Sequence, residues 1–383
     1  MKIYDRTVRG MLAAPQKAHL GRLADQRLFE KKRSIQTWIK ELPPVEITDR
    51  SNRSFYPGLA RDLERLLVMP RGSLQLEDKT FTSYRKKTQL TTVSFNGNPW
   101  LILKIFVDNT VAHSVLRAYN EAEGCESFSS IPGVVSPKLI VQAKLSGKAA
   151  PPYAILVGES VVSGISLLNW LELGAKKDGE ERTAFIGRAE DLTRQCAEMI
   201  QRVHLDQPAP EDQKSILLPE VLEAEAVDIL DKMESAVISR EEAARIRRFL
   251  RCNRQFASRI YRVRAHRDFT TNNILFSDTY DTVGIIDLEK SGSEYPGKDI
   301  SKFTESLVID GPNIGLREEE ADNLGETFKQ AYWQSMSFPN FGNFLRMVKF
   351  YQVYTILSFI DYDLRDQFRA NVLAARLRKV IAS

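Results

Sequence analysis

The chain has 383 residues, of which 43% are hydrophobic and 27% are charged, with a formal net charge of +4 at pH 7. These values exclude a collagen-like chain, a wholly disordered chain and a small domain held together by disulfides. The small net charge gives little support to a polyanionic partner such as nucleic acid. The length allows two domains, or two lobes with an appendage.

The sequence carries no sign of export or membrane insertion. No run of about eighteen apolar residues occurs, so we expect no membrane span, and the first residues lack the apolar core of a signal peptide. Cys125, Cys196 and Cys252 lie far apart and form no zinc-binding spacing with the four histidines. We therefore expect a cytoplasmic protein with buried, reduced thiols.

Residues 1–72 differ in charge from the rest of the chain. The first 53 residues contain twelve lysines and arginines against six acidic residues. Helical patterns run through residues 17–41, and leucines at helical spacing predict a second helix over 57–67. We interpret residues 1–72 as a basic helical extension whose charged face packs against the next domain. An arm that binds a partner or a substrate is the alternative.

Residues 73–160 carry strand patterns around a clear turn. Asn96-Gly97-Asn98 lies between two runs of mostly β-forming residues, 91–95 and 100–106, and therefore predicts a hairpin. A helix over about 112–128 and a strand at 155–157 follow. The order strand, strand, helix, strand predicts a small antiparallel sheet with one packed helix.

Residues 161–383 are mainly helical in pattern. Two brief strand-like runs, 274–276 and 283–286, interrupt the helices. Six apolar residues alternate steps of four and three along one predicted helix, so we assign them to core packing. They are Phe185, Ala189, Leu192, Cys196, Met199 and Val203.

Two motifs beside these brief strands carry the chemistry. The first reads His266-Arg267-Asp268-Phe269-Thr270-Thr271-Asn272-Asn273, and the second reads Ile286-Asp287-Leu288-Glu289. An Asp, an Asn five residues later and an Asp at the end of the next strand can converge on one point. One carboxylate can take the proton of an acceptor hydroxyl, while an amide oxygen and a second carboxylate hold Mg²⁺ against phosphates. The pair of motifs therefore predicts phosphoryl transfer.

The motifs resemble those of the aminoglycoside phosphotransferase and choline kinase branch of the protein-kinase-like superfamily. The H-x-D-x-x-x-x-N pattern matches at His266, Asp268 and Asn273. The Ile-Asp-Leu-Glu at Asp287 is similar to that branch's Ile-Asp-Trp/Phe-Glu and differs from the Asp-Phe-Gly of protein kinases. The resemblance implies that Asp268 is the catalytic base, Asn273 and Asp287 are metal ligands, and His266 braces the loop. Asp299 stands where the family carries a structural Asp.

The same resemblance implies further residues upstream. A kinase-like fold needs a strand lysine that grips the α- and β-phosphates and a helix glutamate that pairs with it. Lys104 lies inside an apolar strand pattern, and Glu121 matches the family's helix better than Glu123 does. The hinge should follow the next strand, so backbone groups near Glu159 and Val161 should bind the adenine edge.

Two departures from the family pattern leave alternatives open. The predicted phosphate-covering loop, Thr80–Thr88, contains no glycine, so a pseudokinase or an ATP-binding regulatory module is one alternative. Ser83, Lys86, Lys87 or Thr88 are candidates for phosphate contacts there. Arg267 stands where the family mostly has Gly, which keeps a lipopolysaccharide-core sugar kinase-like or protein kinase-like enzyme as another.

We therefore expect an α+β, two-lobed protein kinase-like fold. Residues 1–72 would form the helical basic extension, 73–160 a small antiparallel-sheet lobe, and 161–383 a larger helical lobe with the catalytic loop and acceptor site. The expected activity uses ATP and Mg²⁺ and moves the γ-phosphate to a hydroxyl of a sugar, an aminoglycoside or an amino alcohol. The expected partner is this small-molecule acceptor, with no nucleic acid.

Overall fold

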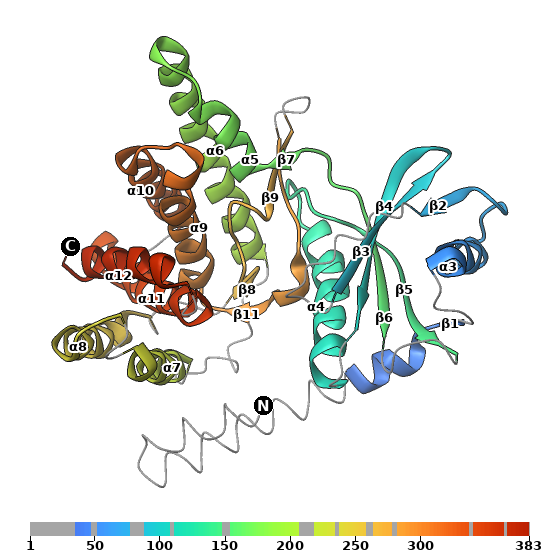
Figure 1. Cartoon of the computed structure of the whole chain (residues 1–383), viewed down its shortest axis with the longest axis horizontal. Helices are drawn as coiled ribbons and strands as arrows, with labels where there is room; N and C mark the ends of the chain where they lie inside the picture. Colours follow the sequence, from blue (N-terminus) through green and yellow to red (C-terminus); the bar gives the residue numbers. More distant parts are fainter. Residues whose placement is uncertain are drawn as a thin grey trace, which may run out of the picture. The chain divides into compact units, whose positions relative to one another are not determined.

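The computed structural model of the chain describes residues 35–46, 52–76, 88–107, 111–147, 154–206, 218–233, 237–257, 263–277, 282–336, 340–363 and 366–382. These residues divide into two compact units (Figure 1). The sheet unit comprises Arg27–Gly164 and Gly284–Ser291, and the helical unit comprises Ile165–Val283 and Gly292–Ser383. The predicted α+β class is confirmed by these elements.

The sheet unit is built on six strands in the order β1-β5-β6-β4-β3-β2. β1 is parallel to β5, and the pairs from β5 to β2 are antiparallel. The strands are β1 (Pro44–Glu46), β2 (Leu74–Leu76), β3 (Thr88–Phe95), β4 (Asn98–Phe106), β5 (Leu139–Ser146) and β6 (Ile155–Ser160).

The predicted hairpin is the β3–β4 pair. Its turn is Asn96-Gly97, whose φ angles of 51° and 80° are both positive. Two successive positive φ angles define the type I′ turn, which matches the right-handed twist of the flanking strands and favours Asn-Gly. The strand resumes at Asn98, two residues earlier than the sequence pattern placed it.

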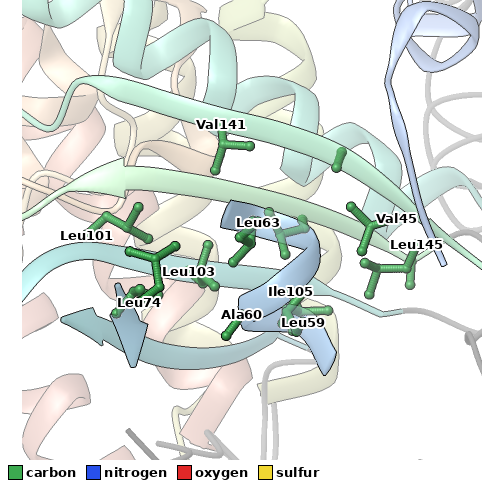
Figure 2. Packing of buried hydrophobic residues seen from close by; sticks show 14 residues of the cluster. Val45, Leu59, Ala60, Leu63, Leu74, Leu101, Leu103, Ile105, Val141 and Leu145 are labelled. Carbon is green, nitrogen blue, oxygen red and sulfur yellow. The ribbon is translucent and has the colours of Figure 1, made fainter. Parts of the chain in front are cut away.

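Helices cover both faces of this sheet. Because side chains alternate along β4, Leu101, Leu103 and Ile105 share one face with α3 (Asn52–Leu66), as Figure 2 shows for Leu59 and Leu63. Full burial of each leucine stabilises the fold by about 2 kcal/mol. Lys104 and Phe106 belong to the opposite face, where the core includes Val115 and Ala118 of α4 (Val111–Ser129).

The sequence analysis placed residues 1–72 in a helical extension, and two elements within that range, β1 and α3, are part of the sheet unit. Val45 of β1 and Leu63 of α3 are buried in its core. Residues 35–41 are helical as predicted, and the rest of the predicted 17–41 helix lies outside the described residues. β1 and β5 are two strands that the sequence prediction omitted.

The helical unit contains eight α-helices in the described part of the chain. They are α5 (Leu167–Ala175), α6 (Gly179–Asp206), α7 (Leu218–Met233), α8 (Arg240–Ala257), α9 (Gly297–Asp310), α10 (Glu318–Ser335), α11 (Phe341–Asp363) and α12 (Gln367–Ala382). Short strands accompany them: β7 (Ile165–Ser166), β8 (Val263–Ala265), β9 (Ile274–Ser277), β10 (Thr282–Ile285) and β11 (Gly292–Glu294). A short 3-10 helix lies at Pro312–Ile314, and another, Leu288–Lys290, belongs to the sheet unit.

The core of the helical unit lies among α6, α9, α10 and α11. All six residues of the predicted α6 stripe are buried, from Phe185 to Val203. The expectation of buried thiols is correct for Cys125 and Cys196 and wrong for Cys252, which is exposed on α8. Among the described helices, none is long and apolar enough to cross a membrane.

Candidate active site

In the sheet unit, Lys104 is the centre of a buried group of charges. Its Nζ lies 2.5 Å from Oε1 of Glu121, 3.0 Å from Oε1 of Glu159 and 3.8 Å from Oδ1 of Asp287. Burial by itself would lower the pKa of Lys104, but these carboxylates outweigh burial and raise its pKa well above the usual value. The predicted contact between Lys104 and Glu121 is present.

Glu121 has a more demanding environment than the lysine. Burial and the neighbouring Glu159 raise the pKa of Glu121 well above its ordinary value, although Lys104 acts in the opposite direction. Its Oε1 accepts hydrogen bonds from Lys104 and from the backbone N–H of Leu288, whereas its buried Oε2 accepts none from the described residues. One ammonium thus balances several carboxylates in this group.

Glu159 has a contact that the sequence prediction missed. We expected its backbone to bind adenine, yet its side chain is buried and pairs with Lys104. Alternation along β6 places Glu159 on the same face as Val157 and Ile155, which pack on the α4 side of the sheet. The backbone N–H of Val161 donates to the carbonyl of Trp100 at 3.4 Å. Adenine binding near Glu159 and Val161 stays a prediction.

The segment after Asp287 is attached to α4. Asp287 is left-handed, with φ 64° and ψ 61°. Asn120 donates to the carbonyl of Glu289 at 3.1 Å, and Nε of Arg117 donates to its carboxylate at 3.1 Å. Gly124 lies so close that an added Cβ would stand 2.6 Å from Cβ of Leu288. One face of α4 therefore positions both the partner of Lys104 and the motif that contains Asp287.

The carboxylates around Asp287 suit a hard cation. Ligand oxygens of Glu121, Asp287 and Glu289 all lie within 4.8 Å of one another. Asp287 has the most exposed side chain of the three, at 21%. Carboxylate oxygens are the ligands that Mg²⁺ prefers, so the donor set fits the predicted metal.

The other face of α4 borders a separate cavity of about 510 Å³. Tyr119, Glu123 and Glu126 line it together with Trp38. These α4 residues are three and four positions apart, so they form a stripe of their own. Glu123 therefore belongs to this cavity, whereas Glu121 belongs to the group around Lys104.

In the helical unit, Asp299 holds the backbone of the predicted catalytic loop. Its Oδ2 accepts the N–H of His266 at 2.8 Å, and its Oδ1 accepts the N–H of Arg267 at 2.6 Å. Arg267 is left-handed, with φ 67°. Asp299 is fully buried at the start of α9. Its carboxylate therefore fixes the conformation of the loop by accepting these two backbone N–H groups.

A second buried pair supports Asp299. Nε2 of His204 lies 3.0 Å from Oδ2 of Asp299, and Nδ1 of His204 lies 2.6 Å from the hydroxyl of Tyr332. Because a carboxylate accepts, Nε2 of His204 carries a proton and donates it to Asp299. Burial and the nearby Asp299 raise the pKa of Tyr332 well above its usual value. The sequence analysis assigned no role to His204 or Tyr332. The signal for His204 was its position four residues after Ile200, on the buried face of α6.

The loop also fixes the predicted base and ligand. The N–H of Asp268 donates to Nδ1 of His266 at 3.2 Å, so His266 braces the turn that presents Asp268. Nδ2 of Asn273 donates to the carbonyl of Asp268 at 2.9 Å. This bond uses the amide nitrogen, and the amide oxygen is the atom that a cation needs.

Some predicted positions lie outside the described residues. Ser83, Lys86 and Lys87 of the predicted phosphate-covering loop belong to this group. Thr88 is described as the first residue of β3, and its hydroxyl accepts a hydrogen bond from Arg117 at 2.6 Å.

Residues 162–338 match the sequence model of the phosphotransferase enzyme family. This segment of the chain is therefore similar to that family. Both predicted motifs and Asp299 lie inside the matched segment. The match confirms the predicted resemblance and the predicted enzyme class, a phosphotransferase that acts on hydroxyl groups. Comparison with curated protein sequences gives no match.

Solved structures with a similar fold are kinases at low sequence identity. The chain is 11% identical to an ethanolamine kinase of Plasmodium vivax, with a TM-score of 0.55 and coverage of 91% of this chain and 93% of that chain. It is 13% identical to a glucosamine kinase in complex with glucosamine, ADP and inorganic phosphate, with a TM-score of 0.54 and coverage of 84% and 83%. A thermostable aminoglycoside phosphotransferase mutant with ADP and hygromycin B is 12% identical, with a TM-score of 0.53 and coverage of 85% and 98%. These likenesses establish the kinase-like fold.

Proposed function

We propose that the protein transfers the γ-phosphate of ATP to a hydroxyl of a small molecule. The observation that carries this proposal is the loop held by Asp299, which presents Asp268 and Asn273 from one fixed turn. Two backbone N–H groups on one buried carboxylate hold the loop rigidly, as a positioned general base requires. The family match of residues 162–338 supports the same reaction.

Asp268 is the proposed general base. Its carboxylate accepts the proton of the acceptor hydroxyl as the hydroxyl oxygen attacks the γ-phosphorus of ATP. The bond between that phosphorus and the β–γ bridging oxygen breaks, and ADP leaves. His266 keeps Asp268 in place through its Nδ1, because this nitrogen accepts the N–H of Asp268.

Lys104 and Glu121 are proposed to hold the nucleotide. The buried Lys104 ammonium is suited to the α- and β-phosphates, and Glu121 keeps it oriented. Asn273 and Asp287 are the proposed Mg²⁺ ligands, with Glu121 and Glu289 next to Asp287. When bound, Mg²⁺ would neutralise the charge on the phosphate oxygens.

The proposed acceptor is a sugar, an aminoglycoside or an amino alcohol. The names of three solved structures of similar fold include ethanolamine, glucosamine and hygromycin B. A screen for ADP formation should therefore start with these three compounds and extend to other sugars and amino alcohols. Water alone as the acceptor gives the background rate.

Two substitutions separate an enzyme from an ATP-binding scaffold. Asp268→Asn should lower turnover by about 10²–10⁴-fold, because the base is lost, and should keep the thermal shift given by Mg·ATP. Asp287→Ala should abolish that shift. Asp191→Asn is a matched control, because Asp191 forms an exposed ion pair with Arg194 on α6. In this variant the turnover and the thermal shift given by Mg·ATP should both be unchanged. ATP binding without turnover on any acceptor would support the scaffold and refute the proposal.

A further inference from the structure

Helix α9 contacts the predicted catalytic loop along a single stripe. Asp299 accepts the N–H groups of His266 and Arg267, as described above. Two turns further on, the hydroxyl of Ser306 accepts the N–H of Thr271 at 3.1 Å. Residues at positions i, i+3 and i+7 share one face of a helix. Position 302 therefore faces the loop between these two contacts.

Lys302 occupies that position and reaches Asp268. Its Nζ lies 3.6 Å from Oδ1 of Asp268, and the two side chains are 13% and 14% exposed. The same Nζ lies 4.4 Å from the ring centroid of Phe359 on α11. An aromatic face attracts an ammonium group and limits its freedom. The lysine is thus directed at the carboxylate by its helix and by the ring.

The loop itself brings no cation to Asp268. From Asp268 to Asn273 the sequence reads Asp-Phe-Thr-Thr-Asn-Asn, with no basic residue. The preceding Arg267 is 3.8 Å from the carboxylate of Glu294 on β11. The ammonium 3.6 Å from Asp268 belongs to α9, more than thirty residues along the chain.

We propose that Lys302 is a positioning residue of the reaction, acting through Asp268. Its ammonium holds the carboxylate in the orientation in which it accepts the hydroxyl proton. This inference rests on the proposed function, because it assumes that Asp268 is the base. It adds a residue that neither of the two sequence motifs contains.

Lys302→Met is the first test. Methionine keeps an unbranched apolar stem against Phe359 and removes only the charge. We expect kcat to fall by roughly 10- to 100-fold, a part of what a general base contributes, with KM for ATP within about threefold because Lys302 acts on the base. Lys302→Arg keeps the charge and should restore kcat to within about fivefold.

Lys298→Met is the matched control. Lys298 lies one turn earlier on α9, and its Nζ is 4.0 Å from the ring centroid of Tyr354, so it makes the same kind of aromatic contact. Its removal should leave kcat within about twofold of the wild-type value. All variants are compared below their measured unfolding midpoints, and Lys302→Gln replaces the methionine variant if that variant does not fold.

A double substitution tests the route through Asp268. In the Asp268→Asn background, Lys302 has no carboxylate to orient, so adding Lys302→Met should lower the residual rate by less than about threefold. Full additivity of the two losses would overturn the proposed route. Wild-type kcat in Lys302→Met, with Asp268→Asn inactive, would overturn the inference and leave the proposed function intact. Absence of transfer by the wild-type protein would overturn both.

Discussion

Asp299→Asn is the change that most directly tests how the catalytic loop is held. The carboxylate accepts two backbone N–H groups, at 2.8 and 2.6 Å, and Nε2–H of His204 at 3.0 Å. Asparagine has the same shape but replaces one acceptor oxygen by an NH₂ group. Whichever way the amide turns, one N–H donor then faces another donor.

The expected loss can be worked out from these three bonds. A hydrogen bond to a charged group contributes about 1.5–3 kcal/mol, and the other two bonds weaken when the charge is removed. Breaking a buried charged network costs about 3–5 kcal/mol, which corresponds to a fall in unfolding midpoint of roughly 6–20 °C. Calorimetry measures this fall, and kcat below the midpoint should drop at least tenfold because Asp268 loses its fixed position.

Tyr332→Phe is the control for this prediction. It removes only the 2.6 Å bond to Nδ1 of His204, at the far end of the same network. The expected cost is about 1 kcal/mol, with kcat within about threefold. If Asp299→Asn unfolds at the wild-type temperature and keeps its kcat, Asp299 does not hold the loop.

Two further predictions concern other parts of the protein. Gly124→Ala places a Cβ 2.6 Å from Cβ of Leu288, so it should lower the free energy of unfolding by about 1–3 kcal/mol and weaken Mg·ATP binding. Gly187→Ala is the control, because an added Cβ there meets nothing within 4 Å, and it should be neutral or stabilising. Equal thermal shifts for the two variants would contradict the packing argument. The hydrogen bond from Arg378 lowers the pKa of Glu242 from 4.5 to about 2. The ionised Glu242 therefore stabilises the folded protein fully above pH 4.5, and this stabilisation is lost as the pH falls toward 2. Glu242→Gln should therefore cost about 1 kcal/mol at pH 7, with a smaller difference at pH 3, measured by urea unfolding; a difference that is independent of pH would refute this.

The sequence was informative where a local rule decides the structure. Asn96-Gly97 predicted the hairpin because positive φ at two successive positions is strongly disfavoured for most residues. The pairing of Lys104 with Glu121 was predictable because a lysine inside an apolar strand needs a buried partner. The apolar spacing of α6 likewise identified the buried stripe from Phe185 to Val203.

Contacts between distant segments were not predictable in the same way. β1 has only three residues, too few for a periodic signal. Its partner β5 alternates apolar and polar residues from Val141 to Ser146, a strand pattern that the sequence prediction did not use. Lys302 and Asp268 are separated by three strands, a short 3-10 helix and the start of α9, so only the folded chain brings them together. His204 is similar, because a histidine on a buried helix face does not name its partner.

Each of the two predicted motifs contains a left-handed residue. Arg267 and Asp287 have φ angles of 67° and 64°, and each costs roughly 1–2 kcal/mol relative to an ordinary conformation. Each is over-determined by separate contacts. Asp299 holds the amide of Arg267, and the residue after Asp287 donates its N–H to Glu121. These bonds hold both motifs in strained conformations, and the strained residues lie beside Asp268 and at Asp287, the two carboxylates of the proposed reaction.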